Sequence, residues 1–560
     1  MAAVAMRTAA LAVICLAHAS QAAFRTSLKL PDFRNQLAQS ERETHVAARG
    51  GVRPELLYPE HNISVPVDHF HNDSSYEPHS DAFFNLRYWF DASHYQPGGP
   101  VIVLQSGETS GKGRLPFLQK GIVAQLCQAT GGLGVVLEHR YYGTSFPTPD
   151  LSTENLRFLT TDQAMADQVY FAQNIVFPGL EHLNLTSHQN AYIAYGGSYA
   201  GAFVAFLRKL YPDVYWGAIS SSGVTEAIYD YWQYFEAAEL YAPTACVSAT
   251  QWLTNIVDNI LIKKNGTDLP GRLKRAFGLG NITRSDDFAN TISVGISGLQ
   301  STNWDPEQNS TDFGVYCDAV SSQKVLYPHC ADIKSEVQSL ILAGGYEDQV
   351  DSLVNPMLNW IGWLNDTVVS TCKNKTQDEC FTNFDSNFYQ KDDLKQTWRS
   401  WPYQYCKEWG YLQTGSGVPV DKLPLVSRLV DLNYTSVVCK EAFNITTLPD
   451  VESINKHGGF GISYPRLAII DGEKDPWRAA TPHAIGQPDR PSTASEPFIL
   501  IKDGVHHWDE NGLFPNETTP DMPPQPVADT QKMEAMFVQE WMMEWKLHLA
   551  GTRLDEWEDL

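Results

Sequence analysis

Ser198 lies in a glycine-rich run, residues 196–200 (Gly-Gly-Ser-Tyr-Ala), that could hold a reactive hydroxyl on a tight turn. Residues 191–195 before it are apolar or aromatic, as in a buried strand, and residues 203–210 after it have a helical apolar pattern. A serine on such a strand-to-helix turn exposes its hydroxyl, and the turn is known as a nucleophile elbow. The usual pattern is Gly-x-Ser-x-Gly, so Ala200 departs from it by one methyl group. We predict that Ser198 is a nucleophile; the alternative is a surface serine in a glycine-rich loop.

A serine nucleophile needs a base that takes its proton and an acid that orients the base. In α/β-hydrolases these groups follow the serine in the order Asp or Glu, then His, just past the carboxyl ends of strands. Two strand-like runs downstream, residues 466–470 and 497–501, are followed by such side chains. The residues alone leave more than one candidate in each loop. The candidates are Asp471, Glu473 and Asp475 for the acid, and His506 and His507 for the base.

The negatively charged oxygen that forms during acyl transfer needs backbone N–H donors. One donor is expected from the residue after the nucleophile, Tyr199, and another from the loop after the first buried strand, at Glu108. Other histidines, including His139, are interpreted as structural. The cysteines show no metal-ligand spacing, and the predicted chemistry uses no metal and no cofactor.

Short apolar runs alternate with helical patterns around the elbow, which indicates a parallel sheet. From about residue 226 to 457, strand-like runs become rare while aromatic residues, cysteines and glycosylation sequons become dense. We therefore predict an α/β-hydrolase fold with an inserted, mostly helical, disulfide-rich cap domain and a final helix at about residues 529–549. The predicted parts are a signal peptide at 1–22, an N-terminal arm or propeptide at 23–60, a hydrolase domain at 61–225 and 458–550, and the cap at 226–457.

The first residues have the pattern of a secretory signal, with Arg7 before an apolar stretch and small residues before a cleavage site after Ala22 or Ala23. No later stretch is apolar for about 18 residues, so we expect no membrane span after cleavage. The net charge of −24 argues against nucleic acid and anionic membranes as partners, and favours a protein that works in acid. The predicted location is secreted, or vacuolar or lysosomal.

Eight cysteines remain after signal removal, and an even number in a secreted chain predicts disulfides. Cys372 and Cys380 are close enough to close a short loop, and the other pairings stay open. Cys127 stands apart from the rest, so a free buried thiol is its alternative. Eleven Asn-x-Ser/Thr sequons predict a glycoprotein. They lie at Asn62, Asn72, Asn184, Asn265, Asn281, Asn309, Asn365, Asn374, Asn433, Asn444 and Asn516.

The motifs resemble the serine peptidases of the prolyl carboxypeptidase and dipeptidyl peptidase II family, which cleave after proline. Within that family, the chain is most similar to secreted fungal acid prolyl endoproteases, from about residue 60 to the final helix. Two departures, Ala200 and Asp471-Gly472, remove no catalytic group. The family motifs match at Gly107-Glu108, 138–143, 159–167, 196–199, Asp475-Pro476-Trp477 and Gly504-Val505-His506, and the fungal ones at 226–235, 277–280 and 286–288.

The resemblance implies that Asp475 is the catalytic acid, that His506 is the base, and that the helical unit caps the active site. It implies peptide or protein substrates that contain proline, and it favours an endoprotease. A Pro-X carboxypeptidase or a dipeptidyl peptidase of the same family is the alternative. An esterase or lipase on the same fold, and a non-catalytic binding protein, are rivals of other classes. A proline pocket should be apolar and partly aromatic, and Trp232 and Trp477 are candidates for it.

Overall fold

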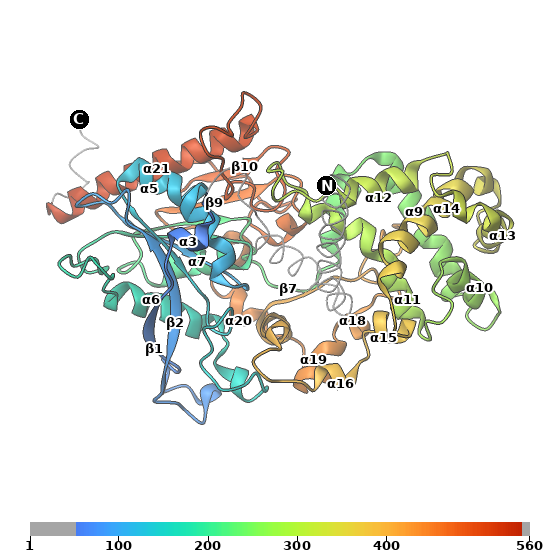
Figure 1. Ribbon diagram of the computed structural model, residues 1–560, viewed down its shortest axis with the longest axis horizontal. Coiled ribbons are helices and arrows are strands. Elements are labelled where there is room, and N and C mark those ends of the chain that lie inside the picture. Colours follow the sequence, from blue (N-terminus) through green and yellow to red (C-terminus); the bar gives the residue numbers. More distant parts are fainter. Residues whose placement is uncertain (1–51, 552–560) are drawn as a thin grey trace, which may run out of the picture.

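The computed structural model describes residues 52–551. The predicted signal peptide lies outside these residues, and so does most of the predicted N-terminal arm. Figure 1 shows two regions: a sheet flanked by helices on the left, and a group of helices on the right that contains α9, α10, α12, α13 and α14.

An eight-stranded sheet forms the first region, with the strand order β1-β2-β4-β3-β5-β6-β9-β10. All neighbouring pairs from β4 to β10 are parallel, whereas β1 and β2 run antiparallel at one edge. This order confirms the α/β-hydrolase fold. The strands are β1 (His61–Pro66), β2 (Phe83–Asp91), β3 (Val101–Gln105), β4 (Leu133–Leu137), β5 (Tyr192–Gly197), β6 (Gly217–Ser221), β9 (Leu467–Gly472) and β10 (Phe498–Ile501).

Helices cover both faces of this sheet, because successive side chains of a strand point to opposite sides. Val101 and Val103 of β3 belong to the core that also holds Phe171 of α6 (Thr161–Asn174) and Phe203 of α7 (Tyr199–Leu210). Ile102 and Leu104 belong to the other core, with residues of α5 (Ile122–Thr130) and α21 (Gln525–Leu549). Helices α5 and α21 pack against each other, as Figure 1 shows at the upper left. Helix α21 begins four residues before the predicted start.

The segment between β6 and β9 is mostly helical, as its composition predicts. Its only strands among the described residues are the short parallel pair β7 (Ile228–Asp230) and β8 (Gly410–Leu412). We keep the domain boundaries at residues 225/226 and 457/458 as a proposal. The helices are α8 (Glu236–Tyr241), α9 (Thr244–Leu261), α10 (Leu269–Ala276), α11 (Ser285–Ile292), α12 (Asp312–Ser321), α13 (Lys334–Ala343), α14 (Val350–Thr367), α15 (Gln377–Phe381), α16 (Ser386–Tyr389), α17 (Ser400–Gln404), α18 (Leu432–Thr435), α19 (Val437–Phe443) and α20 (Glu452–Asn455).

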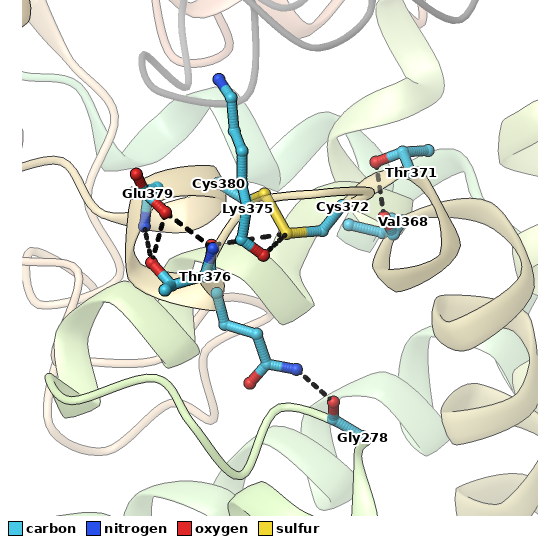
Figure 2. The surroundings of a disulfide bond; sticks show 9 residues. Gly278, Val368, Thr371, Cys372, Lys375, Thr376, Glu379 and Cys380 are labelled. Atoms are coloured by element: carbon cyan, nitrogen blue, oxygen red, sulfur yellow. Dashed lines mark hydrogen bonds between the residues drawn. A yellow bond between two sulfur atoms is a disulfide. The ribbon is translucent and has the colours of Figure 1, made fainter.

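Three disulfides lie in this helical segment, and one of them closes the predicted short loop between Cys372 and Cys380. In Figure 2 that loop leads into α15, where Thr376 and Glu379 form a capping box. The side chain of Gln377 donates to Gly278 O at 2.7 Å and so ties the loop to the turn after α10. The other two disulfides join Cys246 to Cys317 and Cys406 to Cys439.

Of the eight cysteines, six form disulfides as predicted and two do not. Among the described residues, Cys127 and Cys330 are free and buried. Cys127 of α5 packs in an apolar core, in agreement with its alternative as a buried thiol. Cys330 joins the core of the helical segment, where burial raises the pKa of its thiol and disfavours the reactive thiolate.

Candidate active site

Ser198 occupies the turn between β5 and α7, with φ 61° and ψ −125°. A non-glycine residue rarely adopts this conformation, which costs on the order of 1–3 kcal/mol and is held in place by the surrounding fold. The close approach of strand and helix explains the neighbouring glycines. A Cβ at Gly196 would lie 2.2 Å from Ala200 O, and one at Gly201 would lie 2.8 Å from Gly223 Cα. The predicted strand, turn and helix are therefore confirmed, and the half-buried serine is positioned at the carboxyl end of β5.

The departure at Ala200 fits the local packing. Its Cβ lies 3.1 Å from the position that a Cβ would take at Gly196, and 3.6 Å from the corresponding position at Gly107. The methyl group thus fills space left by two glycines, so a glycine at residue 200 is not needed. The same contact brings the loop at Gly107-Glu108 against the elbow, where the two predicted oxyanion donors, Tyr199 and Glu108, were expected to meet.

The buried pair of Asp475 and His506 lies at the same end of the sheet. Asp475 Oδ2 and His506 Nδ1 are 2.8 Å apart, and the two residues are only 1% and 2% exposed. The other carboxylate oxygen, Oδ1, accepts the backbone N–H of Trp477 at 2.9 Å. This contact caps the short helix η12 (Pro476–Ala480), and it fixes the rotamer of the acid. The imidazole is thereby held by one nitrogen, which leaves Nε2 for a reacting group.

The remaining candidate acids and the second histidine have other partners. Asp471 contacts His483 Nδ1 at 2.7 Å, and Glu473 accepts the backbone N–H of Asp503 at 3.0 Å. His507 faces Glu510, with Nδ1 and Oε2 3.0 Å apart. Of the three acids and two histidines left open by the sequence pattern, Asp475 and His506 form the only hydrogen-bonded acid–histidine pair in the described chain.

Ser198 follows β5 and His506 follows β10. Both strands run in the same direction, with β6 and β9 between them, so the two residues lie at the same end of the sheet. The elbow and the histidine loop are joined through β6 and the residue after it. Ser198 N donates to Ser221 O at 2.9 Å, and His507 N donates to Ser222 Oγ at 2.9 Å. No hydrogen bond links Ser198 Oγ to His506 within residues 52–551. A base and nucleophile are often loosely aligned before substrate binds.

The surroundings of Asp475 and His506 determine the charge that each side chain carries. Burial lowers the pKa of His506 below its ordinary value, although the nearby Asp475 carboxylate opposes this effect. Burial alone would raise the pKa of Asp475, but the charge and hydrogen bond of His506 outweigh it and hold that pKa low. The result is a neutral imidazole beside an ionised carboxylate, the arrangement of a general base and its orienting acid.

A polar network beneath the elbow includes His139, in agreement with its structural interpretation. His139 Nε2 contacts Tyr199 OH at 2.9 Å, and Gln404 Nε2 donates to the same hydroxyl at 2.9 Å. Burial lowers the pKa of His139 to about 4, so the ring is neutral at ordinary pH. The network anchors the side chain of Tyr199 and thereby the first turn of α7. The backbone N–H of Tyr199 is one of the two predicted oxyanion donors. Gln404 comes from the helical segment, and its role has no signal in the sequence.

Three buried carboxyl groups, those of Asp509, Glu510 and Glu534, lie close to one another, and no pattern in the sequence signals them. Asp509 accepts hydrogen bonds from Tyr195 OH and Ser221 Oγ, and burial raises its pKa to about 6. Glu534 of α21 is fully buried, and neither of its carboxylate oxygens has a hydrogen-bond partner among the described residues. Burial, followed by the nearby charges of Asp509 and Glu510, raises the pKa of Glu534 well above its ordinary value.

The two candidate tryptophans have different surroundings. The Trp477 ring is nearly buried, stacks on Tyr231 with centroids 5.2 Å apart, and lies 6.4 Å from the His506 ring. Trp232 instead lines a cavity of about 360 Å³ between η4 (Trp232–Phe235), α8 and the loop at Asp475. Leu240 and Ile485 add apolar surface to this cavity, while Glu236 and Glu473 add carboxyl groups. Trp477 thus lies against the ring of His506, whereas Trp232 shares its cavity with Asp475.

Comparisons with known proteins bear on this arrangement. The family model described as "Serine carboxypeptidase S28" matches residues 66–521. A "Probable extracellular serine carboxypeptidase" of Arthroderma benhamiae is 53% identical over 530 residues, which cover 94% of this chain and 73% of that protein. "Serine protease vicPa" of Bipolaris victoriae is 31% identical over 76% of this chain and 80% of its own length. "Thymus-specific serine protease" of Homo sapiens is 24% identical over 76% and 78%.

Solved structures are more distant. A proline iminopeptidase of Mycobacterium smegmatis has 13% identity and a TM-score of 0.32, covering 86% of this chain and 99% of that one. A lipase in its open form has 10% identity and a TM-score of 0.30, with coverages of 86% and 99%. Neither similarity is high enough to bear on activity. Among the described helices, none has the length and apolar character that a membrane span requires.

Proposed function

Since the chain belongs to the serine carboxypeptidase S28 family and is thus a serine peptidase, we propose that it cleaves peptide bonds after proline through Ser198, Asp475 and His506. The observation that carries the catalytic assignment is the 2.8 Å contact between His506 Nδ1 and Asp475 Oδ2, beside the elbow that holds Ser198. The family match supports the peptidase chemistry. The resemblance to proline-specific peptidases supports the substrate class.

In this mechanism, His506 Nε2 takes the proton of Ser198 Oγ while the oxygen attacks the carbonyl carbon of the substrate proline. The carbonyl oxygen becomes negatively charged and accepts hydrogen bonds from the backbone N–H groups of Tyr199 and Glu108. Asp475 stabilises the imidazolium that forms. The imidazolium then gives its proton to the leaving amine, which completes cleavage of the peptide bond and leaves an acyl-enzyme.

Water then releases the acyl group in a second half of the reaction, in which the water molecule is the nucleophile and Ser198 Oγ is the leaving group. His506 removes a proton from the water, the hydroxide attacks the ester carbonyl, and the proton returns to Ser198 Oγ as the new carboxyl group leaves. Every proton transfer uses the same imidazole nitrogen. The neutral form of His506 is therefore required at the start of both halves of the reaction.

Activity in acid follows from this requirement. Burial lowers the pKa of His506, so the imidazole stays neutral to lower pH than an exposed histidine does. The acidic composition of the chain, with a net charge of −24, supports the same working range because self-repulsion falls as carboxylates are protonated. Secretion is supported by the signal-like N-terminus and by the name of the extracellular relative in Arthroderma benhamiae.

Trp477 supports specificity for proline. A proline ring presents apolar C–H groups and donates no backbone N–H, so a flat aromatic surface near the base suits it. Tyr231, Tyr411 and Trp477 pack together on the side of His506, with Tyr411 and Trp477 centroids 5.2 Å apart. The cavity at Trp232 is apolar enough to take another side chain of the peptide.

The position of the cut along the substrate has two candidates. Our proposal is an endoprotease, on the resemblance to fungal prolyl endoproteases. The name of the relative at 53% identity favours a carboxypeptidase instead. The experiment uses a long peptide with an internal proline and blocked ends, beside a short N-blocked peptide that ends in Pro-X. Cleavage of the long blocked peptide supports the endoprotease, and cleavage restricted to the short one refutes it.

A panel of substrates tests the rest of the proposal. The protein should cleave N-blocked peptides after proline far faster than the matching alanine peptides, and an active-site serine reagent should stop it. Fast hydrolysis of simple acyl esters without prolyl cleavage would instead support an esterase or lipase. Absence of labelling by the serine reagent would support a non-catalytic protein.

A further inference from the structure

Two histidines and an aspartate gather in the connection between β1 and β2. Within residues 52–551, Asp68, His71 and His79 are the side chains whose ligand atoms all lie within 4.8 Å of one another and could hold a metal ion. We propose that these three residues form a structural zinc site. The spacing of the cysteines gives no hint of it, because the ligands are histidine and aspartate.

The carboxylate of Asp68 is already held in place for such a role. It is buried, and its Oδ1 accepts hydrogen bonds from Phe70 N at 2.9 Å and from Gln163 Nε2 at 2.7 Å. These contacts orient one oxygen and leave Oδ2 facing His79 Nδ1 at 2.8 Å. Ligands of metal ions are commonly fixed by hydrogen bonds of this kind to their other atoms. The buried aspartate is therefore the rigid member of the site.

The two histidines approach the carboxylate from the solvent side. Their rings stack with centroids 5.3 Å apart and an interplanar angle of 21°. The His79 side chain is 25% exposed and the His71 side chain is 49% exposed, so the outer ring is free to turn. At zinc–ligand distances of about 2.0–2.2 Å, tetrahedral ligand atoms are about 3.3 Å apart. Zinc binding therefore needs a rotation of His71 and a shift of His79 by about 0.5 Å away from Asp68 Oδ2, without movement of the buried aspartate.

The donor set selects the metal. Two imidazole nitrogens and one carboxylate oxygen suit zinc, whereas calcium and magnesium prefer oxygen ligands alone. The Asp81 carboxylate is fully exposed, with Oδ1 3.9 Å from His71 Nδ1, and it or a water completes the tetrahedron. When zinc binds, the proton that now lies between His79 Nδ1 and Asp68 moves to Nε2 or to solvent. Zinc thus takes the place of the hydrogen bond between these two side chains.

The site is distant from the proposed reaction in the order of the sheet. It follows β1 at one edge, while the loops of Asp475 and His506 follow β9 and β10 at the other edge. The segment that it would close is anchored by Val67 N to Ala82 O and by Arg157 to Pro78 O. Zinc therefore links residues 68, 71 and 79 to one another and stabilises this connection. Its effect should be on stability, with no direct part in peptide hydrolysis.

The test compares zinc binding to the full chain and to single variants. After treatment with EDTA, titration calorimetry with zinc chloride near neutral pH should detect a site in the wild-type protein. His71→Ala and His79→Ala should weaken this binding by more than about tenfold. His188→Ala removes an exposed histidine outside the cluster and should leave the affinity unchanged. Zinc should raise the unfolding temperature of wild type and His188→Ala by about 2 °C or more, and should not raise that of His71→Ala.

The result is decisive even if one variant folds poorly. His79→Ala also removes the hydrogen bond to Asp68, but exposed His71 makes no such bond, so His71→Ala should fold normally. Wild-type affinity in His71→Ala, or no binding by the wild-type protein, would overturn the zinc site. Cobalt chloride offers a second readout, since a tetrahedral site with these ligands should give visible absorption in wild type and none in His71→Ala. Prolyl peptidase activity of His71→Ala, measured in parallel, should equal that of wild type.

Discussion

Glu534→Gln should make the protein more stable near neutral pH and leave its stability in acid unchanged. The Glu534 carboxyl is fully buried without a hydrogen-bond partner among the described residues, and its pKa lies well above the ordinary 4.5. Between 4.5 and the raised pKa, the folded state holds a proton that the unfolded state has lost. The stability of the wild type therefore falls as pH rises through this range.

The size of the effect follows from proton linkage. One proton of difference changes the free energy of unfolding by about 1.4 kcal/mol per pH unit. Over each pH unit between 4.5 and the raised pKa, the wild type should thus lose about 1.4 kcal/mol that glutamine, which cannot ionise, does not lose. At about pH 3.5 both side chains are neutral in both states, so the variant and the wild type should differ little.

Urea unfolding, followed by tryptophan fluorescence at several pH values, measures this difference. The control is Glu540→Gln, which removes an exposed carboxylate from the same helix and should show no comparable pH dependence. Asp509, whose pKa burial raises to about 6, titrates in the wild type and in the control alike. An advantage of Glu534→Gln that is the same at every pH, or that shrinks as pH rises, would refute the buried neutral carboxyl.

Three further predictions concern the site and the surface. His506→Ala should lower kcat/KM by at least about 10⁴-fold, and His507→Ala by less than about 100-fold, because of the two histidines only His506 contacts Asp475. Steady-state kinetics on a prolyl peptide measures both losses, and equal losses would contradict the assignment. Trp477→Leu should reduce the preference for proline over alanine by about tenfold or more in a comparison of kcat/KM, whereas an unchanged ratio would exclude this ring from the pocket. Ten of the eleven sequon asparagines are exposed, and Asn365 is the exception. Its Nδ2, where a glycan would attach, donates to Ile361 O at 2.7 Å inside α14, so mass spectrometry of glycopeptides should find Asn365 unmodified.

The elbow and the parallel sheet could be predicted because local patterns specify them. The run at 196–200 needs glycine where strand and helix nearly touch, and buried strands have apolar runs that stand out in the sequence. The antiparallel strands β1 and β2 were not predicted, since their burial alternates irregularly and polar residues interrupt them. The start of α21 was placed late because Pro526, which is tolerated in a first helical turn, resembles a loop residue.

The choice within the site depends on contacts that no local pattern reveals. Asp471 and Asp475 are both acids just past a strand, and only the turn at Trp477 directs one of them toward His506. The pairing of Cys246 with Cys317 likewise joins residues that lie far apart in the chain. Glu534 shows the same limit, because a glutamate on an amphipathic helix is normally exposed and nothing in its neighbours signals burial.

The most direct test of the central claim is the activity of Ser198→Ala on a proline-containing peptide. The variant removes only the hydroxyl from a turn that the surrounding glycines allow, so it should keep its fold. Circular dichroism and urea unfolding verify that it does. Cleavage after proline should fall by about 10⁴-fold or more, and labelling by an active-site serine reagent should disappear. Near wild-type cleavage by the folded variant would contradict the assignment of Ser198, Asp475 and His506 as the catalytic groups.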